Sequence, residues 1–472
     1  MRRVYIIAVV IFWLSMMCLL FQREVLPNIV ILNTTGYEMR FTRDIPIRES
    51  WMGVYFKDKK IGFSNTVMLQ DIYNGIPGYR INESVLLRLN MLGQERLVKI
   101  KGSSFFGEDY GLKDFNYRFF SDGYWLEIYG ENKNEDFCIS INTPAHKTER
   151  QLKIEKGTLV SNSISPFFLF KRLDLKKEIN LRVFEPLSLT VNKVVVRDIG
   201  REILNIDGKN YETSILETDL MGIKTRSWIT EDGDIIKEES SLGFVMQKEG
   251  MEKALEMGGL RSRDKLDITV QFSVMPDRPI PMPRQTSYLK VEKDHAVIEI
   301  IKDKEPDAKD VLRLPIEFMP EEDFIHSNNK RIIDLAKDIV KDEKDSWDSA
   351  KKILSWVYKN IRKTPSFGIP SSLEVLNTMQ GDCNEHTVLF TALARSIGIP
   401  TKMVAGLVYL NDSFYYHAWP RVYVGTWINM DPTLGQFIAD ATHIPILEGG
   451  LREQMELLSV IGDSKIKILE YR

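Results

Sequence analysis

Residues 381–386 read Gly-Asp-Cys-Asn-Glu-His, and this stretch decides how the C-terminal part of the chain is interpreted. Residues 387–394 follow as a helix-like run, which Gly398 and Pro400 bring to an end. Cys383 therefore stands in the first turn of a predicted helix. The positive end of the helix dipole favours a thiolate at that position, and the thiolate is the nucleophilic form of cysteine.

Two polar residues farther along the chain suit the same chemistry. His417 lies in Phe-Tyr-Tyr-His-Ala-Trp (414–419), and Asp431 ends Trp-Ile-Asn-Met-Asp (427–431). Both runs are rich in aromatic and β-branched residues and are predicted to be strands. A thiol, an imidazole base and a carboxylate that orients the base are the parts of a cysteine triad. The sequence therefore predicts catalytic roles for Cys383, His417 and Asp431.

These motifs resemble those of the transglutaminase-like superfamily, in which a papain-like core carries a Cys-His-Asp triad. The shared motifs are Gly-Asp-Cys, Leu-Ala-Arg, Gly-Ile-Pro, His-Ala-Trp and Asp-Pro-Thr, which begin at positions 381, 393, 398, 417 and 431. The resemblance covers residues 332–446, and it matches Cys383 to the nucleophile, His417 to the base and Asp431 to the orienting residue. The segment around Cys383 and residues 439–443 are similar to the bacterial branch of the family.

Simpler interpretations stand beside the catalytic ones. Cys383 could be a buried structural thiol, His417 a half-buried strand residue, and Asp431 an ordinary turn residue before proline. His386 lies one helical turn beyond the cysteine, where it could contact substrate or pair within the core. Tyr415 and Trp419 are further candidates for substrate binding.

No metal and no cofactor is expected. Asp440 and His443 have a spacing at which two ligands share a helix face, but two ligands are too few for a metal site. Loops of alternating carboxylates, which bind calcium, are absent from the sequence. The net charge of −3 gives no electrostatic reason to expect nucleic acid as a partner.

The spacing of His417 and Asp431 permits a geometric prediction. If a strict two-residue turn joined their strands at 425–426, the two side chains would point to opposite faces of the sheet. A triad needs them on one face. We therefore predict an odd-length connection or a bulge, which makes Asp431 the diagonal neighbour of His417.

The first residues suggest a membrane anchor. Residues 4–21 are an unbroken apolar run after Arg2 and Arg3, and as a helix they would span roughly 27 Å, close to the thickness of a bilayer core. The arginines favour a cytoplasmic N-terminus. An uncleaved anchor in the cytoplasmic (inner) membrane, with the bulk of the chain on the periplasmic side, is therefore expected; a cleaved signal peptide is the alternative. Cys138 and Cys383 would then both be free.

Period-two patterning dominates residues 51–274, and Asp-Gly pairs at 122, 207 and 232 are typical of hairpin turns. An antiparallel meander, curled to protect one face, is expected there. Four prolines between 276 and 283 mark a stiff linker. Helical spacing begins near residue 329 and strands follow from 402. The predicted domains are an anchor (1–24), a β-rich domain (25–275), a linker with a short β segment (276–325) and a catalytic domain (326–472).

The predicted fold class is α+β: a papain-like transglutaminase core at the C-terminus, preceded by a large antiparallel β domain and an N-terminal transmembrane helix. The predicted function is that of an exported cysteine acyl-transfer enzyme, which cleaves or cross-links amide bonds of proteins or peptides through a thioester on Cys383. Cell-envelope peptides or proteins are the expected substrates. The alternative is a non-catalytic binding protein whose β domain holds a lipid or peptide.

Overall fold

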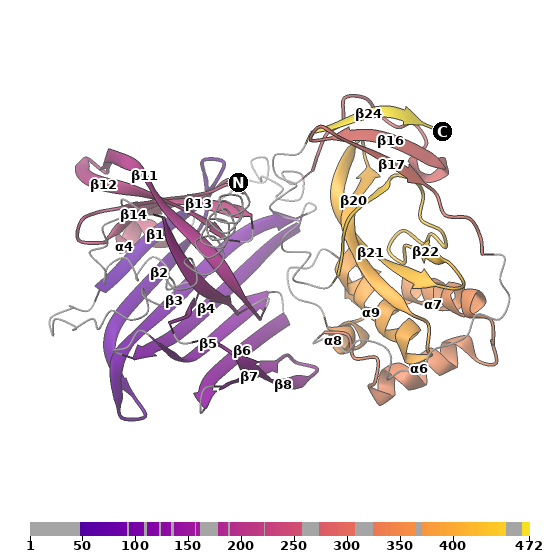
Figure 1. The fold of residues 1–472 in the computed structure, drawn as a ribbon, viewed down its shortest axis with the longest axis horizontal. Coiled ribbons are helices and arrows are strands. Elements are labelled where there is room, and N and C mark those ends of the chain that lie inside the picture. The colour runs from indigo at the N-terminus through magenta and orange to yellow at the C-terminus, as the bar shows by residue number, and fades with distance from the viewer. Residues whose placement is uncertain are drawn as a thin grey trace, which may run out of the picture.

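The computed structural model describes residues 48–91, 94–107, 111–121, 124–133, 136–155, 157–160, 178–186, 189–220, 222–256, 273–306, 324–364, 371–449 and 465–472. These residues form two lobes (Figure 1). Strands account for 59% of the described residues and helices for 16%. The predicted α+β class is therefore wrong, and the described part of the molecule is mostly β. Among the described residues, helices of more than five residues lie in the second lobe, whereas the strands of the first lobe reach 17 residues in β11 (Thr190–Ile206).

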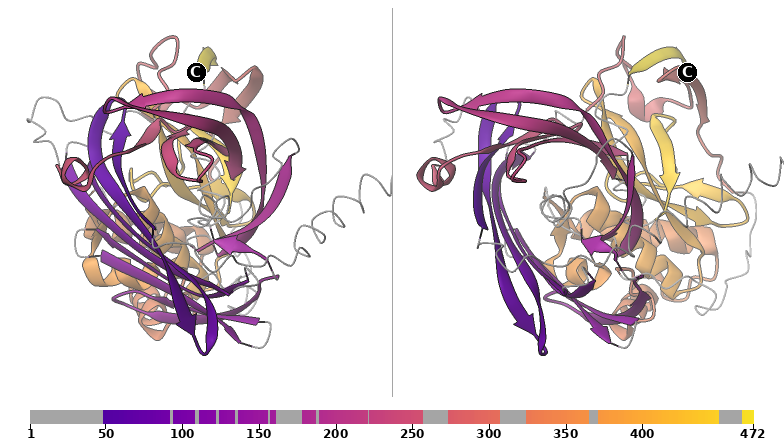
Figure 2. Two further views of the ribbon diagram at one scale, coloured as in Figure 1. Left: turned by 90° about the vertical axis from the view of Figure 1, so that its left-hand side faces the viewer. Right: turned by 60° about the vertical axis from the view of Figure 1, so that its left-hand side comes forward.

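One sheet of 15 strands makes up the first lobe, in the order β8-β7-β6-β5-β4-β3-β2-β1-β15-β14-β13-β12-β11-β10-β9. Neighbouring strands are antiparallel except for β9 and β10. The chain runs outward from β1 to β8 and returns from β9 to β15, so that β15 pairs with β1. The predicted antiparallel meander is confirmed, and the sheet curls around one face (Figure 2).

The first arm of this sheet consists of β1 (Arg48–Phe56), β2 (Lys59–Tyr73), β3 (Ile76–Met91), β4 (Gln94–Gly107), β5 (Leu112–Ser121), β6 (Tyr124–Lys133), β7 (Asp136–Asn142) and β8 (Lys147–Lys153). The second arm consists of β9 (Leu159–Val160), β10 (Ile179–Glu185), β11, β12 (Lys209–Leu220), β13 (Ile223–Ile229), β14 (Ile235–Ser240) and β15 (Phe244–Lys248), followed by the short helix α4 (Met251–Leu255). Asp207 and Gly208 join β11 to β12 with φ angles of 51° and 78°, as a tight hairpin turn requires. The Asp-Gly pair at 122–123 lies outside the described residues.

Aromatic side chains hold the two arms of the sheet together on its inner face. Phe115 of β5 and Phe184 of β10 are both fully buried, and their ring centroids are 5.1 Å apart. Phe137 of β7 stacks on the other side of Phe115 at 6.0 Å. Strands β5 and β10 lie far apart in the strand order, so this contact exists only because the sheet curls. Burial of such large apolar side chains is the main source of stability for the lobe.

The second lobe packs helices α6 (Lys330–Val340), α7 (Ser346–Asn360), α8 (Ser372–Thr378) and α9 (Cys383–Ser396) against a four-stranded sheet (Figure 1). The sheet has the order β22 (Trp427–Asn429), β21 (Ser413–Tyr423), β20 (Thr401–Leu410) and β23 (His443–Glu448). Asn329, Asp345 and Ser371 cap α6, α7 and α8 through side-chain oxygens that accept backbone hydrogen bonds. The helices predicted near residues 329 and 346 are confirmed.

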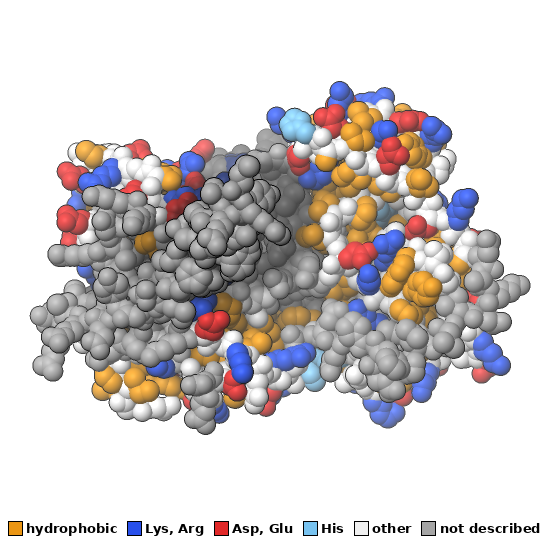
Figure 3. All heavy atoms as spheres, in the orientation of Figure 1, with side chains coloured by type: hydrophobic (Ala, Val, Ile, Leu, Met, Phe, Trp, Pro, Cys, Tyr) orange, Lys and Arg blue, Asp and Glu red, His pale blue; other side chains and the backbone are white. Residues whose placement is uncertain are grey.

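Two smaller sheets complete the second lobe. β16 (Tyr288–Lys293) pairs with β17 (Ala296–Ile301) on one side and with the C-terminal strand β24 (Ile466–Tyr471) on the other. β18 (Arg362–Lys363) pairs in parallel with β19 (Gln380–Gly381) just before the cysteine helix. A short 3₁₀ helix, η3 (Pro283–Gln285), follows the proline-rich segment. Charged side chains of both signs are interspersed over the face of the molecule drawn in Figure 3.

The membrane prediction needs correction. Among the described residues, no helix has both the length and the apolar character needed to cross a membrane. The predicted transmembrane helix, and the single-pass localisation that rested on it, are therefore not borne out by the part of the chain that the structure describes. The segment 4–21, from which the prediction came, lies outside the described residues.

Candidate active site

The N-terminus of α9 presents Cys383 at its first position. Asp382 caps the helix: its carboxylate accepts the N–H of Asn384 at 3.0 Å, while its own N–H donates to Glu385 Oε2 at 2.9 Å. This reciprocal capping box fixes the direction in which the helix starts. A Cβ atom at Gly381 would lie 2.2 Å from Cγ of Glu385, so only glycine fits before the cap. The local sequence thus places the thiol at the positive end of the helix dipole.

β21 and β22 bring His417 and Asp431 onto one face. Arg421 pairs with Asn429 and Tyr423 pairs with Trp427, which leaves a three-residue connection. The predicted odd-length connection is confirmed. Asp431 lies two residues after the end of β22, and its Oδ2 lies 2.8 Å from Nε2 of His417.

Cys383 lies against the strand that carries His417. The backbone amide of Ala418 acts on the Cys383 thiol, whose pKa it lowers. The carbonyl of Ala418 accepts the hydroxyl of Thr387, one turn along α9, at 3.0 Å. The hydroxyl of Tyr416 donates to Oδ1 of Asn384 at 3.1 Å. Helix α9 therefore contacts β21 on both sides of His417, at Tyr416 and at Ala418.

The nitrogen of His417 that faces Asp431 determines what the other nitrogen can do. Because Nε2 lies against the carboxylate, it carries the proton of a neutral imidazole and donates it to Oδ2. Nδ1 then holds the free lone pair. The ring is fully enclosed, since His417 is 4% exposed and stacks on Trp419 with centroids 6.0 Å apart.

Burial alone would raise the pKa of Asp431, which is completely inaccessible to solvent. Two imidazoles overcome that effect and hold its pKa well below the ordinary value: His417, and His443 with its Nε2 at 3.0 Å from the same Oδ2. Oδ1 accepts the N–H groups of Thr433 and Leu434, both at 2.8 Å. The carboxylate is therefore ionised and fully hydrogen-bonded.

His443 is the residue that sequence reasoning missed as part of this site. It was considered only with Asp440 as a weak metal pair, because nothing in the spacing of 431 and 443 indicates contact. Burial would lower its pKa, but hydrogen bonds to Asp431 and Asp440 raise the pKa of His443 to about 9. Asp440 in turn accepts Arg284 and Gln436, at 2.8 and 2.7 Å. The signal in the sequence that could have pointed to His443 is the Ala-Asp-Ala-Thr-His motif at 439–443, which ends with this residue.

The free thiol is not stabilised as a thiolate in this structure. Removal from solvent raises the pKa of Cys383 well above its ordinary value, and the negative charges of Asp382, Glu385 and Asp431 raise it further. The hydrogen bond from Ala418 acts in the opposite direction but does not outweigh them. Burial and these charges therefore oppose the thiolate that the sequence predicted at this helix terminus.

The predicted substrate-binding residues lie in different surroundings. His386 is completely buried; its Nδ1 lies 2.6 Å from the carbonyl oxygen of Asp382, and its Nε2 has no hydrogen-bond partner among the described residues. Trp419 is also completely buried, with its indole N–H on Oδ1 of Asn429 at 3.0 Å. Tyr415 is half-buried. Their predicted contacts with substrate stay predictions.

One group of three among the described residues is close enough to hold a metal ion. The ligand atoms of His417, Asp431 and His443 lie within 4.8 Å of one another. Both imidazoles, however, direct Nε2 at the same carboxylate oxygen at hydrogen-bonding distance. A pKa of about 9 keeps a proton on His443, and metal binding would have to displace it. The three side chains are therefore arranged for hydrogen bonds to one another rather than for binding a metal ion.

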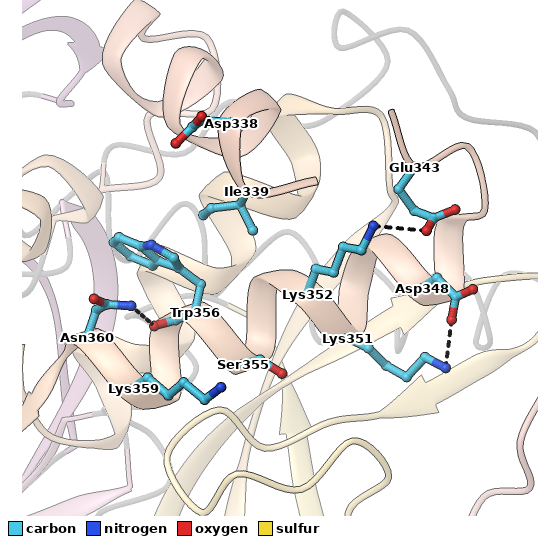
Figure 4. Close-up of a pocket in the computed structure, with 10 residues that line it drawn as sticks. All are labelled: Asp338, Ile339, Glu343, Asp348, Lys351, Lys352, Ser355, Trp356, Lys359 and Asn360. Carbon is cyan, nitrogen blue, oxygen red and sulfur yellow. Dashed lines mark hydrogen bonds and ion pairs between the residues drawn. The ribbon is translucent and has the colours of Figure 1, made fainter. Parts of the chain in front are cut away.

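A hollow of about 690 Å³ lies along α6 and α7, away from this site (Figure 4). Ion pairs line it, including Lys352 with Glu343 at 2.9 Å and Lys351 with Asp348 at 2.7 Å. Trp356 forms its one large aromatic wall. None of the residues that line it belongs to α9, β21 or the Asp431 segment.

Comparison with known proteins assigns the second lobe to a class. Residues 333–432 match the core domain of the transglutaminase-like superfamily. The matched residues include Cys383, His417 and Asp431. The chain therefore carries a transglutaminase-like domain, which agrees with the resemblance noted in the sequence and with a cysteine-dependent enzyme in general.

Two solved structures are similar to parts of the chain. A "putative cysteine protease" from Cytophaga hutchinsonii matches at 19% identity and a TM-score of 0.26, over 33% of this chain and 53% of that one, so the match spans about half of that protein. A beta-barrel-like protein of a domain of unknown function from Brucella abortus matches at 14% identity and a TM-score of 0.32, over 43% of this chain and 94% of that one. No curated protein matches the chain.

Proposed function

We propose that the protein is a cysteine acyl-transfer enzyme that acts on amide bonds of proteins or peptides. The observation that carries the proposal is the hydrogen bond of 2.8 Å between Nε2 of His417 and Oδ2 of Asp431, together with the packing of α9, which carries Cys383, against the strand of His417. A thiol, a base and an orienting carboxylate in this order support nucleophilic catalysis. The match of residues 333–432 supports the same assignment.

The role of each triad residue follows from which of its atoms is free to react. His417 accepts the proton of Cys383 at Nδ1, because Nε2 donates to Asp431. The sulfur attacks the amide carbonyl, and the imidazolium then gives its proton to the departing amine. The products of this half-reaction are a thioester on Cys383 and a free amine. Water or a second amine releases the acyl group, which gives hydrolysis or cross-linking respectively.

Stabilisation of the oxyanion is the remaining requirement. The first N–H groups of a helix have no partner within the helix, so the backbone N–H of Cys383 is available to the developing negative charge.

Of the three predicted substrate-binding residues, Tyr415 is half-buried, so solvent reaches its side chain and it remains the candidate for contact with substrate. His386 and Trp419 are fully buried, and we expect them to shape the site from behind.

An activated acyl donor tests the proposal without knowledge of the natural substrate. The full chain would be treated with p-nitrophenyl acetate at neutral pH, and acetylated residues would be located by mass spectrometry. We expect an acetyl thioester on Cys383 that disappears in Cys383→Ala and forms slowly in His417→Ala. Cys138→Ala is the matched control, because Cys138 is the other free cysteine among the described residues and lies in β7.

The fate of the thioester separates the two reaction types. Decay in buffer alone supports hydrolysis, whereas decay that accelerates with added alkylamine and yields the acetylated amine supports transfer. If Cys383 is acetylated no faster than Cys138, the enzyme proposal fails. The alternative of a binding protein would then be favoured.

A further inference from the structure

His443 occupies a position that the proposed triad does not explain. It is the first residue of β23, is 3% exposed, and presents Nε2 to Oδ2 of Asp431 at 3.0 Å. His417 presents its own Nε2 to the same oxygen at 2.8 Å. One carboxylate oxygen therefore accepts two imidazole hydrogen bonds. A triad needs only one.

The second nitrogen of His443 also faces acceptors. Nδ1 lies 3.1 Å from the backbone carbonyl of Asp440 and 3.4 Å from its Oδ1. A neutral imidazole has one N–H, and only the imidazolium has two. With oxygen acceptors opposite both nitrogens, the hydrogen-bonding pattern is satisfied when His443 carries both protons. The geometry therefore makes His443 a buried cation, and its raised pKa of about 9 agrees.

The charges in this cluster balance. Asp431 and Asp440 each carry one negative charge, and Asp440 also pairs with Arg284 at 2.8 Å. His443 and Arg284 supply two positive charges in direct contact with them. The two carboxylates of the cluster are therefore matched by two cations other than His417. In a simple Asp–His pair the uncompensated carboxylate would favour the imidazolium.

The ionisable groups around His417 and His443 come from several elements. α9 supplies Asp382, Cys383, Glu385 and His386; the segment after β22 supplies Asp431 and Asp440; and η3 supplies Arg284. The carboxylates on α9 oppose a thiolate on Cys383. These contacts favour an uncharged thiol beside an uncharged imidazole before substrate binds.

We propose that His443 is a positioning residue that neutralises Asp431, so that His417 rests as a neutral base and takes the proton of Cys383 only as the thiol attacks. The proposal rests on the proposed function, which it deepens by assigning the resting protonation state. It also explains why Asp431 can be buried completely: the carboxylate orients His417 without remaining an unpaired charge. Without His443, the negative charge of Asp431 would be uncompensated and would favour a proton on His417 as the thiol approaches.

Histidine titration tests this directly. The chain has six histidines, so ring signals of the full-length protein labelled with ¹⁵N-histidine can be assigned by single substitutions. In the wild type we expect both nitrogens of His443 to stay protonated at pH 7, and His417 to be neutral. In His443→Gln the ring signals of His417 should move toward those of the doubly protonated form, because the charge of Asp431 is no longer compensated.

Cysteine reactivity gives an independent readout. The rate of alkylation by chloroacetamide between pH 5 and 9 reports the thiolate of Cys383. We expect His443→Gln to shift the profile about one unit toward lower pH, as an imidazolium–thiolate pair forms. His295→Gln is the matched control, since the His295 side chain is 99% exposed and lies in the β16–β17 turn. It should leave both readouts unchanged.

The outcomes separate this proposal from the proposed function. A neutral His443 in the wild type at pH 7 would overturn the inference, and that measurement needs no variant of His443 to fold. An unchanged titration of His417 in a folded His443→Gln protein would do the same. Failure of Cys383 to accept an acetyl group, with the titrations as expected, would remove only the enzymatic function.

Discussion

The ring of His146 lies edge-on against the ring of His326, with 4.4 Å between their centroids. His146 ends the turn between β7 and β8, whereas His326 precedes α6 in the other lobe. Ala145 in the same turn packs against the helical core, and its backbone hydrogen-bonds Glu374 of α8. The turn at residues 143–146 therefore docks the first lobe onto the second lobe.

This contact predicts that stability depends on pH. Burial, and the neighbouring His146, lower the pKa of His326 to about 4 from an ordinary value of 6.5. Between these values the unfolded chain binds the proton more readily than the folded one, so stability is lost as pH falls from about 6.5 to 4. The loss from this residue is at most about 3 kcal/mol. Thermal unfolding at a series of pH values would measure it.

His326→Gln removes the titrating group and should flatten this pH dependence, whereas the exposed His295→Gln should not. If wild type and His326→Gln lost stability in parallel between pH 6.5 and 4, the contact would not be the cause.

Two threonines one turn apart in α9 should respond oppositely to substitution by valine. The Thr387 hydroxyl donates to the buried carbonyl of Ala418, so Thr387→Val should cost about 1–3 kcal/mol and slow acetylation of Cys383. The buried Thr391 hydroxyl has no partner among the described residues, so Thr391→Val should be neutral or stabilising. Denaturant unfolding measures both. Equal losses would argue against the role of the Thr387–Ala418 bond in holding α9 to β21.

Asp431→Asn should impair chemistry more than it impairs folding. The amide presents an N–H that competes with the N–H groups of the two histidines, so it no longer holds His417 in the tautomer that leaves Nδ1 free. By analogy with the loss of the aspartate in serine triads, the acylation rate of Cys383 should fall by about 10⁴. Asp338→Asn, on the exposed face of α6, is the control. An acylation rate within a few-fold of wild type would contradict the orienting role.

Gly381→Ala should disrupt the start of the cysteine helix. The new Cβ would lie 2.2 Å from Cγ of Glu385, whose carboxylate closes the capping box. We expect a loss of about 1–3 kcal/mol in the free energy of unfolding. Gly250→Ala is matched to it, because nothing lies within 4 Å of a Cβ built there. Equal stability of the two variants would contradict the steric argument.

The sequence by itself determined the local parts of the site. The capping residues before α9, the helix that carries Cys383 and the odd-length connection between β21 and β22 all follow from short-range rules of helix starts and strand alternation. Local rules are reliable here because each involves residues a few positions apart.

Only the tertiary structure decided the rest. β1 pairs with β15, about two hundred residues away, and this pairing joins the two arms of the predicted meander into one continuous sheet. The contact of His443 with Asp431 depends on β23 pairing with β20, and the contact of His146 with His326 depends on two lobes meeting. Hydrophobic periodicity tells which face of an element is buried but not which distant element covers it. The partner, and with it the charge balance of the site, is fixed only when the whole chain packs.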